Sequence, residues 1–232
     1  MPNTREVIKN ARNQGRTVLT EMESKQLLTS LGIRTTVMKL ATSKEEAVAM
    51  SREINYPCVL KVSSLDIVHK SDAGGVKVGL KSEQEVAEAY DTIMASCLSK
   101  FPNAVIEGVT VQNMAVPGLE VMVGMATDPQ FGPVIMFGLG GVWVEVLKDV
   151  TFKIVPLTKG DAAKAVREIR ASRLLYGFRG SDPVDTSKLE DILLRVSEFV
   201  AKTPEIKEMD INPIFAYPDS AVAVDARVIL GE

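Results

Sequence analysis

Histidine and cysteine are almost absent from this sequence of 232 residues, which contains one histidine, His69, and two cysteines, Cys58 and Cys97. A zinc site built from cysteine and histidine ligands is therefore excluded. Two cysteines so far apart offer no disulfide framework, and the expected location is a reducing compartment, most simply the cytoplasm. Any reaction that needs an imidazole must use His69.

An excess of charge of one sign is absent as well. The 27 Lys and Arg residues nearly balance the 30 Asp and Glu residues, and the formal net charge is −3. Such a chain has no general attraction to nucleic acid or to an anionic membrane surface. The longest uncharged stretch, Pro129 to Val144, is too short and too interrupted by glycine and proline to span a bilayer. With a polar N-terminus that lacks an apolar signal region, we expect a soluble globular protein.

Helix and strand signals alternate over residues 34–112. Three capping-box pairs mark helix starts, namely Thr20 with Glu23, Ser43 with Glu46, and Ser82 with Glu85. Apolar, β-rich runs lie at 34–40, 58–62 and 76–80. In the last run Val76, Val78 and Leu80 are expected to share one face of a strand. We interpret residues 34–112 as a smaller α/β lobe that follows a helical segment, residues 1–33.

From residue 104 onward, β-rich runs are joined by short turns, which indicates an antiparallel sheet rather than βαβ units. We expect strands at 104–113, 119–127, 133–138, 142–147, 150–155, 206–211, 213–217 and 221–228. Helices at 159–170 and 187–201 complete a larger lobe over residues 113–232. The two lobes give an α+β fold, with a hinge expected at Pro117 and Gly118.

Lys61 is the first candidate for a phosphate contact. In a strand it points away from the face of Leu60 and Val62, and a lysine directed into a cleft between lobes can hold a phosphate as a point charge. Because exposed lysines are common, its position alone is more typical of a solvent-facing side chain.

The polar loop 63–75 carries His69 between Asp66 and Asp72 and ends in Gly74 and Gly75. Imidazole is a nucleophile, and a glycine pair allows backbone amides to approach an anion closely. Either aspartate could fix the imidazole tautomer through a hydrogen bond to one ring nitrogen. The alternative is a mobile surface loop without a chemical role.

Carboxylate and amide oxygens gather near the C-terminus. Glu208, Asp210 and Asn212 would share one face of a strand, and a neighbouring strand could bring Asp225 opposite them. Oxygen ligands of this kind suit Mg²⁺. Asp225 follows an apolar run, where an isolated carboxylate is costly without a partner. The alternative is a charged outer face of an edge strand.

Three weaker candidates remain. A second glycine cluster, which includes Gly140 and Gly141, fits neither the P-loop spacing nor a dinucleotide fingerprint and can be a tight turn. Glu120 could contact a ribose or an ion. Arg179, on a glycine-flanked loop, could reach a phosphate. Each charged residue is explained equally well as the partner in a surface salt bridge.

Four segments together resemble those of a known family, although none is specific alone. They are Tyr56-Pro-Cys-Val-Leu-Lys61-Val, Ile67-Val-His69-Lys-Ser-Asp-Ala-Gly74-Gly75-Val, Gly138-Leu-Gly-Gly141 and Asp210-Ile-Asn212-Pro213. The sequence resembles the ATP-grasp β subunits of the ADP-forming acyl-CoA synthetases of archaea, specifically those of acetyl-CoA synthetase. The resemblance extends from about Thr20 to Leu230.

The resemblance implies an ATP-grasp fold that holds ATP or ADP between two lobes, with Mg²⁺ as the cofactor. We assign nucleotide contacts to Lys61, Lys77, Gln112, Asn113, Met114, Glu120 and Arg179, and a phosphate-loop role to Gly74, Gly75, Gly140 and Gly141. Asn212 and Asp225 match positions that hold Mg²⁺ in related succinyl-CoA synthetases. Asp210 falls where those relatives carry a longer glutamate that orients a phosphohistidine.

The resemblance also implies that His69 is a phosphorylation site. A CoA-binding α subunit, in an α2β2 heterotetramer, would make acyl phosphate from acyl-CoA and pass the phosphoryl group through its own histidine to His69, which would deliver it to ADP. Neutral imidazole suits this step because its pKa is about 6.5. One alternative is a stand-alone ATP-grasp carboxylate ligase, whose usual N-terminal substrate domain finds no room here. Another is a non-catalytic nucleotide-binding subunit, which would need neither His69 nor the Asn212–Asp225 pair.

Overall fold

The computed structural model of the chain describes residues 4–67, 69–141 and 148–231. It divides into two compact units. The smaller unit is Thr36–Val116, and the larger unit combines Met1–Thr35 with Pro117–Glu232. The N-terminal helices therefore belong to the larger unit. No helix in the described part of the chain is long and apolar enough to cross a membrane.

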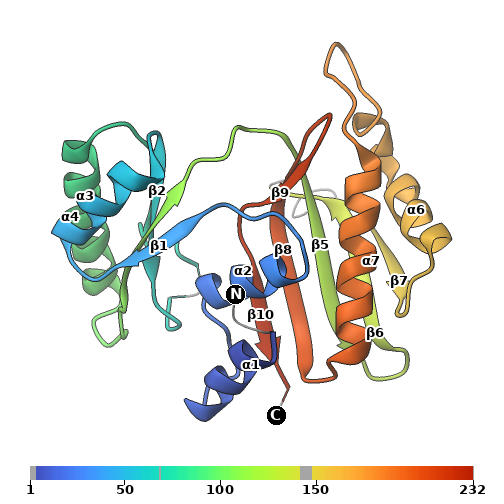
Figure 1. Cartoon of the computed structure of the whole chain (residues 1–232), viewed down its shortest axis with the longest axis horizontal. Coiled ribbons are helices and arrows are strands. Elements are labelled where there is room, and N and C mark those ends of the chain that lie inside the picture. Colours follow the sequence, from blue (N-terminus) through green and yellow to red (C-terminus); the bar gives the residue numbers. More distant parts are fainter. Residues whose placement is uncertain (1–3, 68, 142–147, 232) are drawn as a thin grey trace. The chain divides into compact units, whose positions relative to one another are not determined.

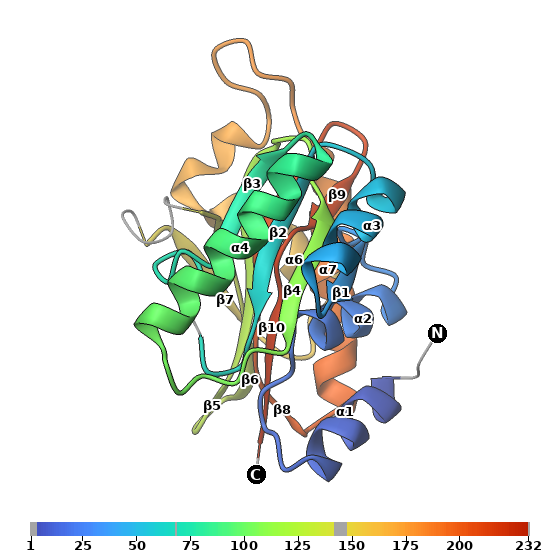
Figure 2. The same cartoon turned by 90° about the vertical axis from the view of Figure 1, so that its left-hand side faces the viewer.

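The smaller unit is a four-stranded antiparallel sheet with two helices on one face (Figure 2). Its strands, in spatial order, are β1 (Met38–Ala41), β4 (Gly108–Asn113), β2 (Cys58–Ser63) and β3 (Val76–Leu80). Its helices are α3 (Lys44–Ile54) and α4 (Glu83–Lys100). Leu60, Val62 and Val111 point from the sheet into the core beneath these helices and are almost fully buried.

The predicted helix starts are confirmed. The Ser43 and Ser82 hydroxyls accept hydrogen bonds from the backbone N–H groups of Glu46 and Glu85. Thr20 and Glu23 form a reciprocal capping box at the start of α2 (Glu21–Ser30). Each pair satisfies backbone donors that the first helical turn leaves without a partner, so a local sequence pattern was sufficient to place these helix ends.

The predicted alternation of β3 is wrong. Cys58 lies opposite Leu80, whereas Leu60 lies opposite Lys77, so β3 contains one extra residue over this stretch. Gly79, with φ of 74°, lies within it. A bulge of this kind transfers the following residues to the other face of the strand. Leu80 therefore shares the face of Leu60, while the side chain of Val78 is 66% exposed.

The larger unit is built on a six-stranded antiparallel sheet (Figure 1). Its main path, in spatial order, is β10 (Arg227–Leu230), β8 (Ile206–Ala216), β5 (Leu119–Asp128), β6 (Gly132–Leu139) and β7 (Val150–Ile154), and β9 (Ala221–Ala223) pairs with β8. The helical elements are α1 (Thr4–Asn13), α2, α6 (Lys159–Glu168), the 3-10 helix η1 (Arg170–Leu174) and α7 (Thr186–Lys202). The antiparallel sheet expected from the short turns is confirmed.

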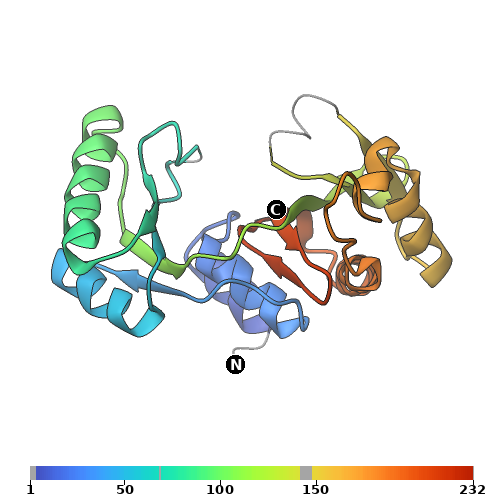
Figure 3. The ribbon, with the colours of Figure 1, turned by 90° about the horizontal axis from the view of Figure 1, so that it is seen from above.

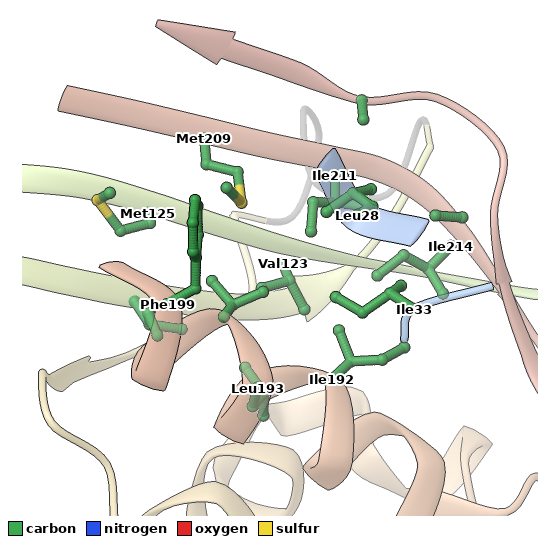
Figure 4. Close-up of a cluster of buried hydrophobic side chains, with 14 of the residues drawn as sticks. Leu28, Ile33, Val123, Met125, Ile192, Leu193, Phe199, Met209, Ile211 and Ile214 are labelled. Carbon is green, nitrogen blue, oxygen red and sulfur yellow. The ribbon is translucent and has the colours of Figure 1, made fainter. Parts of the chain in front are cut away.

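Seen from above, α6 and α7 lie on the same side of this sheet (Figure 3). Apolar side chains fill the space between the sheet and its helices (Figure 4). Val123, Met209 and Ile211 point from the sheet toward Ile192 and Leu193 of α7 in the close-up (Figure 4). Residues that alternate with these three along β5 and β8 therefore lie on the opposite face of the sheet. We call this second side of the sheet its open face, because α6 and α7 cover the other side.

Two of the predicted strands near the C-terminus have other bounds in the structure. Residues 206–216 form one continuous strand, rather than two strands divided at Asn212. The expected strand 221–228 is divided into β9 and β10 by residues 224–226. Both places flank a candidate site, where backbone geometry departs from a regular ladder. The strand expected at 142–147 lies outside the described residues.

Both cysteines are free and buried, Cys58 in β2 and Cys97 in α4. Burial raises the pKa of Cys58 to about 11 and also raises the pKa of Cys97. Because only the thiolate reacts, we expect alkylation at pH 7.5 to be at least about 100-fold slower in the folded protein than in urea. Iodoacetamide labelling followed by mass spectrometry measures this, and rapid labelling of the folded protein would contradict it.

Candidate functional site

A polar group lies on the face of the smaller sheet opposite its helices. Lys61 faces Thr110 across the β2–β4 pairing, and Gln112 is two residues further along β4 on the same face. The Gln112 amide donates to Thr110 Oγ1 over 3.2 Å, and the Thr110 hydroxyl donates to the Lys61 carbonyl over 3.2 Å. The side chains are buried, with Lys61 only 7% exposed. The structure thus joins two of the predicted nucleotide contacts, Lys61 and Gln112.

Three other predicted nucleotide contacts of this unit lie apart from that group. The bulge places Lys77 opposite Leu60, on the face away from Lys61. Asn113 Oδ1 accepts the backbone N–H of Val37 over 2.6 Å, so this side chain ties β4 to the chain before β1. Met114 follows β4 and is 37% exposed. Nucleotide contact by these three residues stays a prediction.

The histidine loop is anchored on both sides of His69. Ile67 and Ala73 are each 1% exposed, whereas His69 is exposed. Asp66 accepts the backbone N–H of Val105 over 2.7 Å, which fixes the loop where it leaves β2. Asp66 therefore stabilises the loop. That Asp66 or Asp72 fixes the tautomer of the His69 imidazole stays a prediction. His69 therefore stands in solvent on a segment with buried supports.

Gly74 and Gly75 are required by packing in this arrangement. A Cβ atom on Gly74 would lie 2.5 Å from Ser96 Oγ, and one on Gly75 would lie 2.5 Å from Val62 Cγ1 and 3.2 Å from Cys97 Sγ. The pair thus lets the loop lie directly on α4 and β2. Its role in phosphate binding stays a prediction.

In the larger unit, the second glycine cluster contacts Glu120 and Asn212. Gly140 donates its N–H to the Glu120 carbonyl over 2.8 Å, and Gly141 donates its N–H to Asn212 Oδ1 over 3.2 Å. The Glu120 carboxylate lies against Gly141, so a side chain at 141 would displace it. Four predicted residues are therefore neighbours, and the φ of 59° at residue 141 favours glycine there.

Asn212 lies in β8, and Asp225 lies in the segment 224–226 that joins β9 to β10. Ile214 pairs with Ala223 and Asp210 with Arg227 on either side of this segment, and Val224 donates its N–H to the Pro213 carbonyl. These contacts hold the segment that contains Asp225 beside the stretch of β8 that contains Asn212, and a metal site formed by the two residues stays a prediction. Within the described residues no cluster of three or more histidine, cysteine, aspartate or glutamate side chains forms a metal site. One amide oxygen and one carboxylate fit Mg²⁺, which usually keeps waters and phosphate oxygens as its other ligands.

Asp210 lies beside this pair. Burial raises the pKa of its carboxyl, the Asp225 carboxylate raises that pKa further, and the facing Arg227 lowers it. Asp210 keeps contact with solvent because it borders a hollow of about 560 Å³ on the open face. Other residues around the hollow include Met122, Met136 and Phe152. The hollow on the open face is thus lined by both charged and apolar side chains, including Asp210 and Glu208.

Arg179 belongs to a separate, ordered loop after η1. Its guanidinium carbon lies 5.3 Å from the centre of the Phe178 ring, and Arg173 lies at the same distance from that ring. The Ser181 hydroxyl and the backbone of Phe178 exchange two hydrogen bonds. No contact in the described part of the chain joins Arg179 to Glu120, Asn212 or Asp225, and its nucleotide role stays a prediction.

Sequence reasoning missed two polar residues at these sites and a third that supports the larger unit. Thr110 links Lys61 to Gln112, and its position in an alternating strand was a usable signal. Arg227 faces Asp210 only because of the register of β10. Asp149, which is 9% exposed, accepts the backbone N–H groups of Arg170 and Ala171 over 2.8 and 2.7 Å and holds η1 against β7. Neither of the last two contacts has a local signature in the sequence.

Comparison with known proteins gives concordant results. A family model described as an ATP-grasp domain matches residues 10–230. The chain is 51% identical over 226 residues to the β subunit of ADP-forming acetate–CoA ligase I from Pyrococcus furiosus, covering 97% of each chain. It is 46% identical over 210 residues to ADP-forming acetate–CoA ligase I of Archaeoglobus fulgidus, which is 90% of this chain and 30% of that protein.

A solved structure from Ca. Korarchaeum cryptofilum agrees with these matches. It is dinucleotide-forming acetyl-coenzyme A synthetase 1 with coenzyme A and Mg-AMPPCP, described with its phosphohistidine segment pointing toward the nucleotide-binding site. The TM-score is 0.87 at 45% identity, over 99% of this chain and all of that one.

The fold and its matches define an ATP-grasp protein. Within that class the chain belongs to the β subunits of ADP-forming acetate–CoA ligases, which are acid–CoA ligases. The family resemblance, the fold class and the ligase class expected from the sequence are confirmed.

Proposed function

We propose that this chain carries a phosphoryl group on His69 between a CoA-binding α subunit and ADP. The observation that carries the proposal is the exposed His69 on a segment with buried supports at Ile67 and Ala73. The phosphohistidine segment described for the Korarchaeum relative supports this role. Assembly with an α subunit as an α2β2 heterotetramer, and location in the cytoplasm, are parts of the same proposal.

In the ATP-forming direction, the partner converts acyl-CoA and phosphate to acyl phosphate and releases CoA. The phosphoryl group passes from acyl phosphate to a histidine of the partner, and the free carboxylic acid leaves. It then passes to His69, where a bond from an imidazole nitrogen to phosphorus forms while the bond to the partner's histidine breaks. An oxygen of the ADP β-phosphate attacks that phosphorus, the nitrogen–phosphorus bond breaks, and ATP leaves. In the reverse direction His69 attacks the γ-phosphorus of ATP, ADP departs, and the imidazole loses its N–H proton.

Residues of both units serve this exchange. Lys61 and Gln112 bind the nucleotide from the smaller unit, and Lys61 balances phosphate charge. Glu120 contacts the nucleotide from the larger unit, beside the Gly140–Gly141 turn. Asn212 and Asp225 hold Mg²⁺, which when bound neutralises charge on the phosphate oxygens. Asp210, whose carboxylate lies near that of Asp225, orients the phosphohistidine.

The function is tested with the complex of this chain and its CoA-binding partner. After incubation with γ-labelled ATP and Mg²⁺, this chain should carry a label that is stable in base and lost in acid, as expected of phosphohistidine. The complex should make acetyl-CoA from acetate, CoA and ATP, whereas this chain alone should bind nucleotide without making acetyl-CoA. Acetyl-CoA synthesis by the purified single chain would contradict the need for a partner.

A further inference from the structure

The segment that follows His69 is held on α4 by two side chains. Ser96 Oγ donates a hydrogen bond to the Ala73 carbonyl over 2.7 Å, and Lys100 Nζ donates to the Asp72 carbonyl over 2.8 Å. Both donors lie near the end of α4, one helical turn apart, so they project in the same direction. Each contacts the backbone of the segment, and neither bond depends on the identity of the residue that it holds.

Residues 69–75 form one compact turn. Ala73 donates its N–H to the His69 carbonyl over 3.1 Å, and Gly75 donates its N–H to the Lys70 carbonyl over 2.8 Å. Side chains of α4 bind the carbonyls of Asp72 and Ala73, and the hydrogen bonds of this turn connect these residues to His69. Any displacement of the turn from α4 moves His69 with it.

The fit between turn and helix is close at Gly74. A side chain there would meet Ser96 Oγ at 2.5 Å, and the φ of 72° also favours glycine. By contrast, Gly79 has nearly the same φ, 74°, but a Cβ atom there would meet no atom within 4 Å. Gly74 and Gly79 therefore form a matched pair. Replacement by alanine strains the backbone at both positions, but only at Gly74 does the added side chain meet α4.

We infer that Ser96 and Lys100 are positioning residues for the phosphoryl transfer, which hold the turn 69–75 in one orientation by its backbone carbonyls. The inference rests on the proposed carrier role of His69. A carrier that serves two sites must leave each of them, and bonds to two carbonyls can break without unfolding α4. Weaker attachment should therefore change the time that His69 spends in this orientation and leave nucleotide binding unaltered.

The first test compares the parent complex with Ser96→Ala, Lys100→Met and the double variant. Loss of each bond should speed hydrogen exchange of the Ala73 and Gly75 amides about fivefold. Exchange in the first three turns of α4 and the Kd for ATP should not change. Rapid-quench measurement of His69 labelling by γ-labelled ATP, and of its discharge to ADP, should show a change of about fivefold or more in the transfer rate, with the KM for ATP constant.

The second test uses the two glycines. Gly74→Ala should accelerate exchange of the turn and alter the transfer rate, and Ser96→Ala added to it should remove the steric clash and slow exchange again. Gly79→Ala should change neither the exchange of the turn nor the transfer rate. The inference would be overturned if the two glycine variants had equal effects. It would also be overturned if the double variant Ser96→Ala/Lys100→Met stayed within twofold of the parent in both the exchange rate of the turn and the transfer rate. If the parent chain takes no label on His69, the proposed function fails, whereas the exchange data still report whether α4 holds the turn.

Discussion

Replacement of His69 by alanine is expected to abolish the base-stable label from γ-labelled ATP and to lower turnover of the α/β complex at least about 1,000-fold. The reason is that the chain has no other histidine, so no second imidazole of this chain can accept the phosphoryl group and pass it to or from the nucleotide. Because His69 is exposed, the variant should keep the melting temperature of the parent and its Kd for ATP. Labelling, turnover and nucleotide binding are measured on the same preparation.

Ser71→Ala is the matched control, since Ser71 is an exposed residue of the same turn and contributes its backbone carbonyl to Gly74. This variant should retain both label and turnover. A His69→Ala chain that carries the parental amount of base-stable label would disprove the carrier role. A base-labile label would point to an acyl phosphate on a carboxylate instead.

Asp225→Asn is expected to weaken Mg²⁺-dependent nucleotide turnover by about 100-fold or more. Removing even an indirect partner of a metal ligand commonly costs about 10–100-fold, and Asp225 is proposed to touch the metal directly. The substitution preserves shape but removes the negative charge of the Asp225 carboxylate. A titration with Mg²⁺ at fixed ATP should show a higher Mg²⁺ concentration at half-maximal rate, with partial recovery at high Mg²⁺.

Asp219→Asn provides the control, because Asp219 is exposed in the turn between β8 and β9 and its carboxylate accepts from the neighbouring Ser220 hydroxyl. It removes the same charge from the same chain without touching the open face. An Asp225→Asn variant whose Mg²⁺ titration overlays that of Asp219→Asn would remove Asp225 from the metal site.

Much of the fold could be predicted from interactions between residues that are close together in the sequence. The capping pairs at Thr20, Ser43 and Ser82 placed three helix starts because the hydroxyl, the backbone N–H and the acidic side chain lie within a single turn. The short turns after residue 104 indicated an antiparallel sheet, because only hairpins connect strands over so few residues.

Other features depended on contacts between distant residues. The bulge at Gly79 places Lys77 and Lys61 on opposite faces of the sheet. The sequence alone shows only that both lysines lie in predicted neighbouring strands. Asn113 reads as part of a nucleotide segment, yet its amide oxygen accepts a backbone N–H from residue 37. Gly74 and Gly75 have the composition of a phosphate loop, while in the fold they allow the turn to pack on α4. Composition cannot distinguish these uses of glycine.

The sequence by itself determined the family, the helix starts, the antiparallel larger sheet and the fact that all imidazole chemistry rests on His69. These properties follow from residue types and from spacings within one turn or one hairpin. Only the tertiary structure decided which side chains share a face and what they touch, including Thr110 between Lys61 and Gln112, Arg227 against Asp210, and Ser96 against Gly74. The physical reason is that strand register and helix packing are fixed by the whole core, and a shift of one residue reverses the face of every side chain in a strand.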